Sequence, residues 1–79
     1  MQNAQIAQLI EKTLDAEVYV EGDGCHFSVT IISEQFTGLS RLKRQQTVYQ
    51  LLNPYIESGD VHAVNMKTYT RQEWNNNHG

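Results

Sequence analysis

Apolar residues recur along this chain with two periods, three to four residues in some segments and two in others. Ile6, Leu9, Ile10 and Leu14 are spaced as on one face of a helix. This spacing predicts a helix from about residue 3 to residue 14, with Asn3 as its cap. The helix would bury a single apolar stripe.

A second helical pattern begins after Ser40, a typical N-cap residue, and runs to about residue 53. Pro54 follows, and we expect it to disturb the helix because proline has no backbone N–H. Near the C-terminus, Thr70 and Glu73 have the spacing of a capping box, which predicts a short third helix containing Trp74. The predicted apolar stripe of the second helix consists of Leu42, Val48, Tyr49, Leu51 and Leu52.

Two segments between the first two helices alternate apolar and polar residues, as half-buried strands do. They are residues 16–21 and 26–33, and the turn sequence Gly22-Asp23-Gly24 between them predicts an antiparallel hairpin. A third strand is predicted from residue 61 to residue 69. The second helix connects the second and third strands, and such a crossover connection predicts that these two strands pair in parallel.

The predicted fold class is therefore α+β, in the order α-β-β-α-β-α, with helices covering one face of a three-stranded mixed sheet. The chain has 79 residues, enough for one domain spanning 1–79. Alternation also predicts which side chains face away from the helices. These residues, which we expect to contact water, are Glu17, Tyr19, Ser28, Thr30, Asn65 and Lys67.

The formal net charge of -3 argues against nucleic-acid binding through bulk electrostatics. Arg41, Lys43 and Arg44 nevertheless form a basic cluster at the predicted start of the second helix. Cations there oppose the helix dipole, so this cluster could contact an anionic partner, with Lys67 as a further candidate, or could simply be solvated. No apolar run approaches the roughly 20 residues of a membrane span, and the N-terminus lacks a signal-peptide pattern, so we expect a cytoplasmic protein without a membrane partner.

The residues with metal-binding chemistry are Cys25, His26 and His62, which stand at the starts of the second and third strands. If these parallel strands begin at the same level, their first residues lie about 5 Å apart in backbone terms. A thiolate and imidazoles could then hold one metal or iron–sulfur cluster, completed by another molecule because a closed zinc site takes four ligands. The alternative is an exposed thiol and two unrelated histidines. No nucleophile elbow, phosphate loop or CxxC pair is present, so we do not expect an enzyme.

Several segments together resemble the BolA family, in particular its short bacterial IbaG-like branch. They are FTGLSRLKRQQTVY at 36–49, VHAVNMKTYT at 61–70, Glu73-Trp74, and Gly22-Asp23-Gly24 ahead of His26-Phe27. The resemblance covers nearly the whole chain. It implies a domain similar to the type II KH fold.

The resemblance also implies a partner and a cofactor. BolA proteins pair with monothiol glutaredoxins that carry a CGFS motif, sharing a 2Fe-2S cluster to which glutaredoxin and glutathione supply thiolates. It implies that His62 is a cluster ligand and that the second comes from the first hairpin. His26 is the preferred residue there, and Cys25 is the substitute.

A different function remains open beside cluster sharing. The resemblance also implies a DNA-binding, stress-linked transcriptional regulator, and Arg41, Lys43, Arg44 and Lys67 could contact phosphates. Gly38 is followed by Leu39-Ser40-Arg41, so the GxxG loop of KH domains is missing. A metal-free protein adaptor and a homodimer also remain open.

Overall fold

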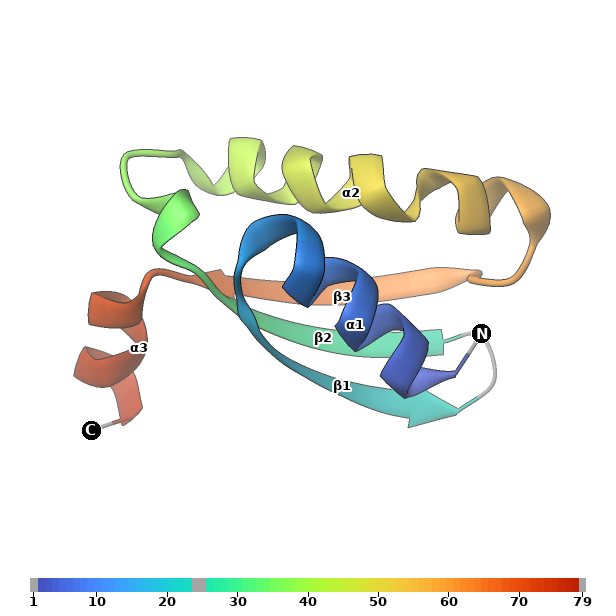
Figure 1. The fold of residues 1–79 in the computed structure, drawn as a ribbon, viewed down its shortest axis with the longest axis horizontal. Helices are drawn as coiled ribbons and strands as arrows, with labels where there is room; N and C mark the ends of the chain where they lie inside the picture. The colour runs from blue at the N-terminus through green and yellow to red at the C-terminus, as the bar shows by residue number, and fades with distance from the viewer. Residues whose placement is uncertain (1, 24–25, 79) are drawn as a thin grey trace.

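The computed structural model describes residues 2–23 and 26–78. It confirms the predicted order of three helices and three strands and adds a short 3-10 helix, η1, after the second strand (Figure 1). The elements are α1 (Asn3–Leu14), β1 (Glu17–Asp23), β2 (His26–Ile32), η1 (Glu34–Phe36), α2 (Arg41–Ser58), β3 (Ala63–Tyr69) and α3 (Arg71–His78).

The sheet has the order β1-β2-β3, with β2 in the centre. β1 pairs antiparallel to β2, and β3 pairs parallel to β2, as the hairpin and the crossover through α2 predict. Val29 in β2 lies between Val20 of β1 and Met66 of β3. This register places the alternating apolar residues of all three strands on one face.

Helices α1 and α2 cover the apolar face of the sheet (Figure 1). The other face is polar, and Tyr19 there is 51% exposed. Helix α3 covers one end of the polar face, because Trp74 stacks on Tyr19 at 6.2 Å and meets Tyr69 edge-on at 5.4 Å. The fully buried side chains of the core are Ile6, Ile10, Val29, Ile31, Phe36, Val48, Leu52 and Val61.

Both long helices differ from the prediction at one end. The N-cap of α1 is Gln2 rather than Asn3, and its backbone N–H donates to Gln5 Oε1 at 2.8 Å. Helix α2 continues through Pro54 to Ser58 because the turn beyond the proline packs Tyr55 against the core. Tertiary burial thus compensates for the hydrogen bond that Pro54 cannot donate.

The predicted apolar stripe of α2 is partly wrong. Val48 and Leu52 are buried, whereas Leu42 is 62% exposed and Tyr49 is 37% exposed. The third strand begins at Ala63 rather than at the predicted Val61, which precedes β3 and is fully buried. The chain enters β3 from the core because the end of α2 lies over the same sheet face.

Candidate functional site

His26 and His62 lie side by side at one end of the sheet. His26 is the first residue of β2 and pairs with Ala63, the first residue of β3, so His62 directly precedes this pair. The two imidazole rings are edge-on with centroids 6.3 Å apart, and both residues are exposed. The predicted proximity of the two histidines is confirmed.

The position of His26 depends on a close backbone approach in the hairpin. Gly22 has φ +142° and pairs with Phe27, and a Cβ at Gly22 would lie 2.2 Å from the carbonyl oxygen of His26. Only glycine fits so close to the neighbouring strand. The predicted turn at residues 22–24 is wrong for Gly22 and Asp23, because both belong to β1 and Asp23 pairs with His26.

Cys25, the alternative hairpin ligand, lies with Gly24 outside the described residues. Among the residues that are described, no group of three or more His, Cys, Asp or Glu side chains could hold a metal ion. The histidine pair can therefore supply two imidazole nitrogens, which is half of a four-ligand set. A shallow hollow of about 280 Å³ adjoins the pair, lined by His26, Phe27, Ser28, Ala63, Val64 and Asn65.

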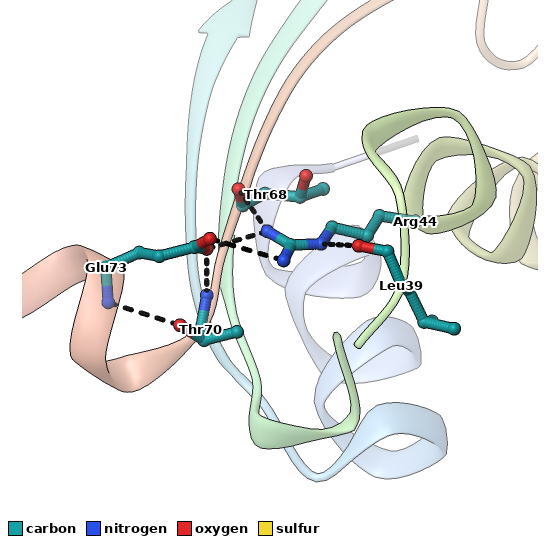
Figure 2. A network of polar contacts seen from close by, with 5 residues as sticks. All are labelled: Leu39, Arg44, Thr68, Thr70 and Glu73. Atoms are coloured by element: carbon teal, nitrogen blue, oxygen red, sulfur yellow. Dashed lines mark hydrogen bonds and ion pairs between the residues drawn. The ribbon is translucent and has the colours of Figure 1, made fainter. Parts of the chain in front are cut away.

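Arg44 is not part of an exposed basic surface, which corrects the prediction for this residue. Its side chain is only 12% exposed, and its guanidinium forms a two-pronged ion pair with Glu73, at 2.7 and 3.3 Å (Figure 2). It also donates to the carbonyl oxygens of Leu39 at 3.0 Å and Thr68 at 3.5 Å. These contacts join the start of α2, the end of β3 and the start of α3.

The predicted capping box completes this network. Thr70 N–H donates to Glu73 Oε1 at 2.8 Å, and Glu73 N–H donates to Thr70 Oγ1 at 3.1 Å. The hydrogen bond from Arg44, followed by the bond from the Thr70 backbone, lowers the pKa of Glu73 from 4.5 to about 2. Arg44 is thus a structural cation that holds α3 in place.

Arg41, Lys43 and Lys67 remain exposed, but the structure does not gather them at one site. Arg41 and Lys43 stand at the start of α2, where the Ser40 hydroxyl caps the helix by accepting from Lys43 N–H at 3.2 Å. Lys67 lies on the polar sheet face in β3. The start of α2 lies at the opposite end of the molecule from the starts of β2 and β3, where the histidine pair stands (Figure 1). Helix α2 between these two ends is roughly 27 Å long.

A second ion pair joins α3 to the edge of the sheet. Arg71 contacts Glu17 at 3.1 Å, and the hydroxyl of Tyr19 donates to the other oxygen of Glu17 at 2.9 Å. The hydrogen bond from Tyr19, then that from Arg71, lowers the pKa of Glu17, and the same bond to Glu17 raises the pKa of Tyr19. Both carboxylates that anchor α3 are therefore ionised in neutral solution.

The structure is a small α+β domain with an exposed histidine pair at one end of its sheet. No helix in the described part of the chain is long and apolar enough to cross a bilayer. A family model described as BolA-like protein matches residues 3–73, and the chain belongs to the BolA family. It is 47% identical over 75 residues to the acid stress protein IbaG of Escherichia coli K12, covering 94% of this chain and 89% of that protein.

Other comparisons agree with the family. The structure of a BolA protein homologue from Coxiella burnetii superposes with a TM-score of 0.84 at 35% identity, covering 95% of this chain and 97% of that chain. The chain is also 42% identical over 53 residues to the DNA-binding transcriptional regulator BolA of Vibrio cholerae, covering 67% of this chain and 49% of that protein. The family and the fold expected from the sequence are thus confirmed.

Proposed function

We propose that this chain is a non-enzymatic partner of a monothiol glutaredoxin in the cytoplasm, and that the two proteins share a 2Fe-2S cluster with glutathione. The cluster is cargo or signal for the pair. The observation that supports the proposal best is the placement of His26 and His62 at one exposed end of the sheet, with ring centroids 6.3 Å apart. The names of its relatives also fit a regulator or accessory protein better than an enzyme.

The donor set fits a shared cluster better than a site closed within one chain. Iron in such clusters accepts imidazole in place of thiolate, and the remaining ligands must come from other molecules. His26 at the start of β2 and His62, which directly precedes β3, provide such a half-site, since the pairing of His26 with Ala63 holds their backbones close together. In this proposal His62 and His26 bind the cluster, and Cys25 is the substitute for His26.

Imidazole ligation determines what this chain contributes to the cluster. Histidine is neutral when it binds and becomes a cation when it is released and protonated, so ligation competes with protons in the physiological range. Replacing thiolate by imidazole also raises the reduction potential of such a cluster. The chain would therefore supply the cluster ligands that are labile and whose binding depends on pH.

Reconstitution with a monothiol glutaredoxin and reduced glutathione tests the proposal. The visible absorption and circular dichroism of the mixed complex should differ from those of the glutaredoxin homodimer, and His62→Ala should abolish that difference. Lys43→Ala, at the far end of α2, is the matched control and should leave the spectrum unchanged. An unchanged spectrum with His62→Ala would refute ligation, and a colourless complex would favour a metal-free adaptor.

A DNA-binding regulator is the second candidate, supported by the exposed cations Arg41 and Lys43 and by the name of the Vibrio cholerae relative. Two phosphate contacts would give weak, strongly salt-dependent binding. A gel shift at about 50 mM salt, lost in the double variant Arg41→Ala/Lys43→Ala, would support this function. Absence of any shift in this low salt would exclude it.

A further inference from the structure

The polar face of the sheet forms a strip that starts beside the histidine pair and ends at Trp74. Across the three strands, Glu21 pairs with Ser28 and Ser28 with Asn65. One row further along, Tyr19 pairs with Thr30 and Thr30 with Lys67. These residues line a hollow of about 290 Å³, which shares Ser28 and Asn65 with the hollow beside His26.

The charges in this strip are separated and of opposite sign. Glu21 stands on the β1 edge and Lys67 on the β3 edge, and neither is among the ion pairs of the described residues. The other two charges described on this face, Glu17 and Arg71, already neutralise each other at 3.1 Å. Among the side chains that the structure describes, the strip thus offers one carboxylate and one ammonium group to a ligand.

The distance between the two charges limits the size of that ligand. Two strand spacings and one two-residue step separate the Cα atoms of Glu21 and Lys67 by roughly 12 Å. A single amino acid spans only about 3.5 Å, whereas three residues span about 10 Å, which flexible side chains can bridge. Between the charges, the Ser28 and Thr30 hydroxyls and the Asn65 amide can hydrogen-bond peptide groups.

We propose that the polar sheet face binds a short zwitterionic peptide, with its carboxylate at Lys67 and its ammonium group at Glu21. Lys67 and Glu21 match the two oppositely charged ends of such a ligand. They do not match a polyanion such as nucleic acid, which requires several cations. Trp74, stacked behind Tyr19, closes the far end of the strip, so the ligand can extend only toward His26.

Reduced glutathione is a tripeptide with one ammonium group and two carboxylates, so it has both charges that the strip matches and one further carboxylate. It is the probe that the cluster proposal brings to this surface. Peptide binding itself does not require the cluster. The role of the bound peptide, which is to present a thiol next to the histidine pair, rests on the proposed function. The test therefore uses the full-length, metal-free chain. If the cluster complex forms but the peptide does not bind, this inference fails while the proposed function stands.

Titration of the isotope-labelled chain with reduced glutathione, followed by amide NMR shifts, measures binding directly. We expect saturable shifts at Ser28, Thr30, Asn65 and Lys67, with Glu21→Gln and Lys67→Gln each weakening binding about two- to fivefold. Lys43→Gln should have no effect, and glycine or an N-acetylated, C-amidated tripeptide should bind more weakly than glutathione. Absence of shifts on the sheet face, or equal binding of the blocked peptide, would overturn the proposal.

Discussion

Arg44 and Glu73, which lie 29 residues apart in the chain, form a two-pronged ion pair that holds α3 against α2 and β3. Arg44 also lies over the ring of Phe36, with its guanidinium carbon 5.8 Å from the ring centroid. The fold therefore uses one of its six basic residues as an internal anchor rather than as a contact for a partner.

Removing this anchor should destabilise the protein measurably. Arg44→Ala leaves the carbonyl oxygens of Leu39 and Thr68 and the carboxylate of Glu73 without their donor, at an expected cost of about 1–3 kcal/mol in the free energy of unfolding. Urea denaturation followed by Trp74 fluorescence measures the change. Arg41→Ala, an exposed neighbour, should stay within about 0.5 kcal/mol. Equal effects of the two substitutions would contradict the structural role of Arg44.

The same pair makes stability depend on pH in the acid range. The folded pKa of Glu73 is about 2, below its ordinary value of 4.5, so the folded state holds fewer protons on this group. Its stabilisation is therefore complete above about pH 4.5 and is lost as the pH falls toward 2. Glu17, whose pKa is also lowered, contributes with the same sign.

Urea denaturation at a series of pH values tests this dependence. In Glu73→Gln, the loss of unfolding free energy between pH 4.5 and 2 should be smaller than in the parent chain, because the variant cannot bind that proton. A Glu57→Gln variant, in which an exposed carboxylate of α2 is removed, serves as the control. Full pH dependence in the Glu73 variant would contradict a role for this carboxylate in the acid sensitivity.

Gly22 should be needed for the placement of His26. In Gly22→Ala, the new Cβ would meet the His26 carbonyl oxygen at 2.2 Å, so the hairpin must shift and we expect a loss of about 2 kcal/mol or more. In Gly38→Ala the φ angle of +81° is strained, but nothing lies within 4 Å, so the cost should be about 1–2 kcal/mol. Thermal unfolding measures both costs, and the NMR shifts of the His26 ring should change only in the Gly22 variant. Unchanged His26 shifts would show that the close approach does not position this residue.

The second cluster ligand can be identified by comparing two substitutions in the hairpin. If His26 binds the cluster, His26→Ala should alter the spectrum of the mixed complex as strongly as His62→Ala, whereas Cys25→Ser should leave it unchanged. The opposite pattern would assign the ligand to Cys25. This comparison needs equal folding of both variants, which far-ultraviolet circular dichroism checks.

The periodicity of apolar residues was enough to predict most of the fold. Val18, Phe27, Val29 and Ile31 alternate on strands that the structure pairs as expected, and the helix between the last two strands required a parallel crossover. The histidine pair could be predicted only conditionally. Its proximity depends on the register between His26 and Ala63, which local patterns do not specify.

Long-range contacts explain the remaining differences. Nothing local to Arg44 distinguishes it from Arg41 and Lys43, because its partner Glu73 belongs to another helix. Ser33 gives a similar case: its buried hydroxyl donates to the carbonyl oxygen of Leu14 at 2.9 Å and joins the end of α1 to the end of β2. Likewise, Pro54 predicted the end of α2, but packing of the following turn continued the helix to Ser58.

Pulsed electron paramagnetic resonance of the reduced mixed complex tests the central claim most directly. With ¹⁵N-histidine incorporated only into this chain, the account predicts strong hyperfine coupling from two directly bound imidazole nitrogens. One of the two nitrogen couplings should be lost in His62→Ala, both should be lost in the double variant His26→Ala/His62→Ala, and both should persist in Lys43→Ala. A reduced cluster with no coupling to histidine nitrogen of this chain would contradict the shared-ligand account.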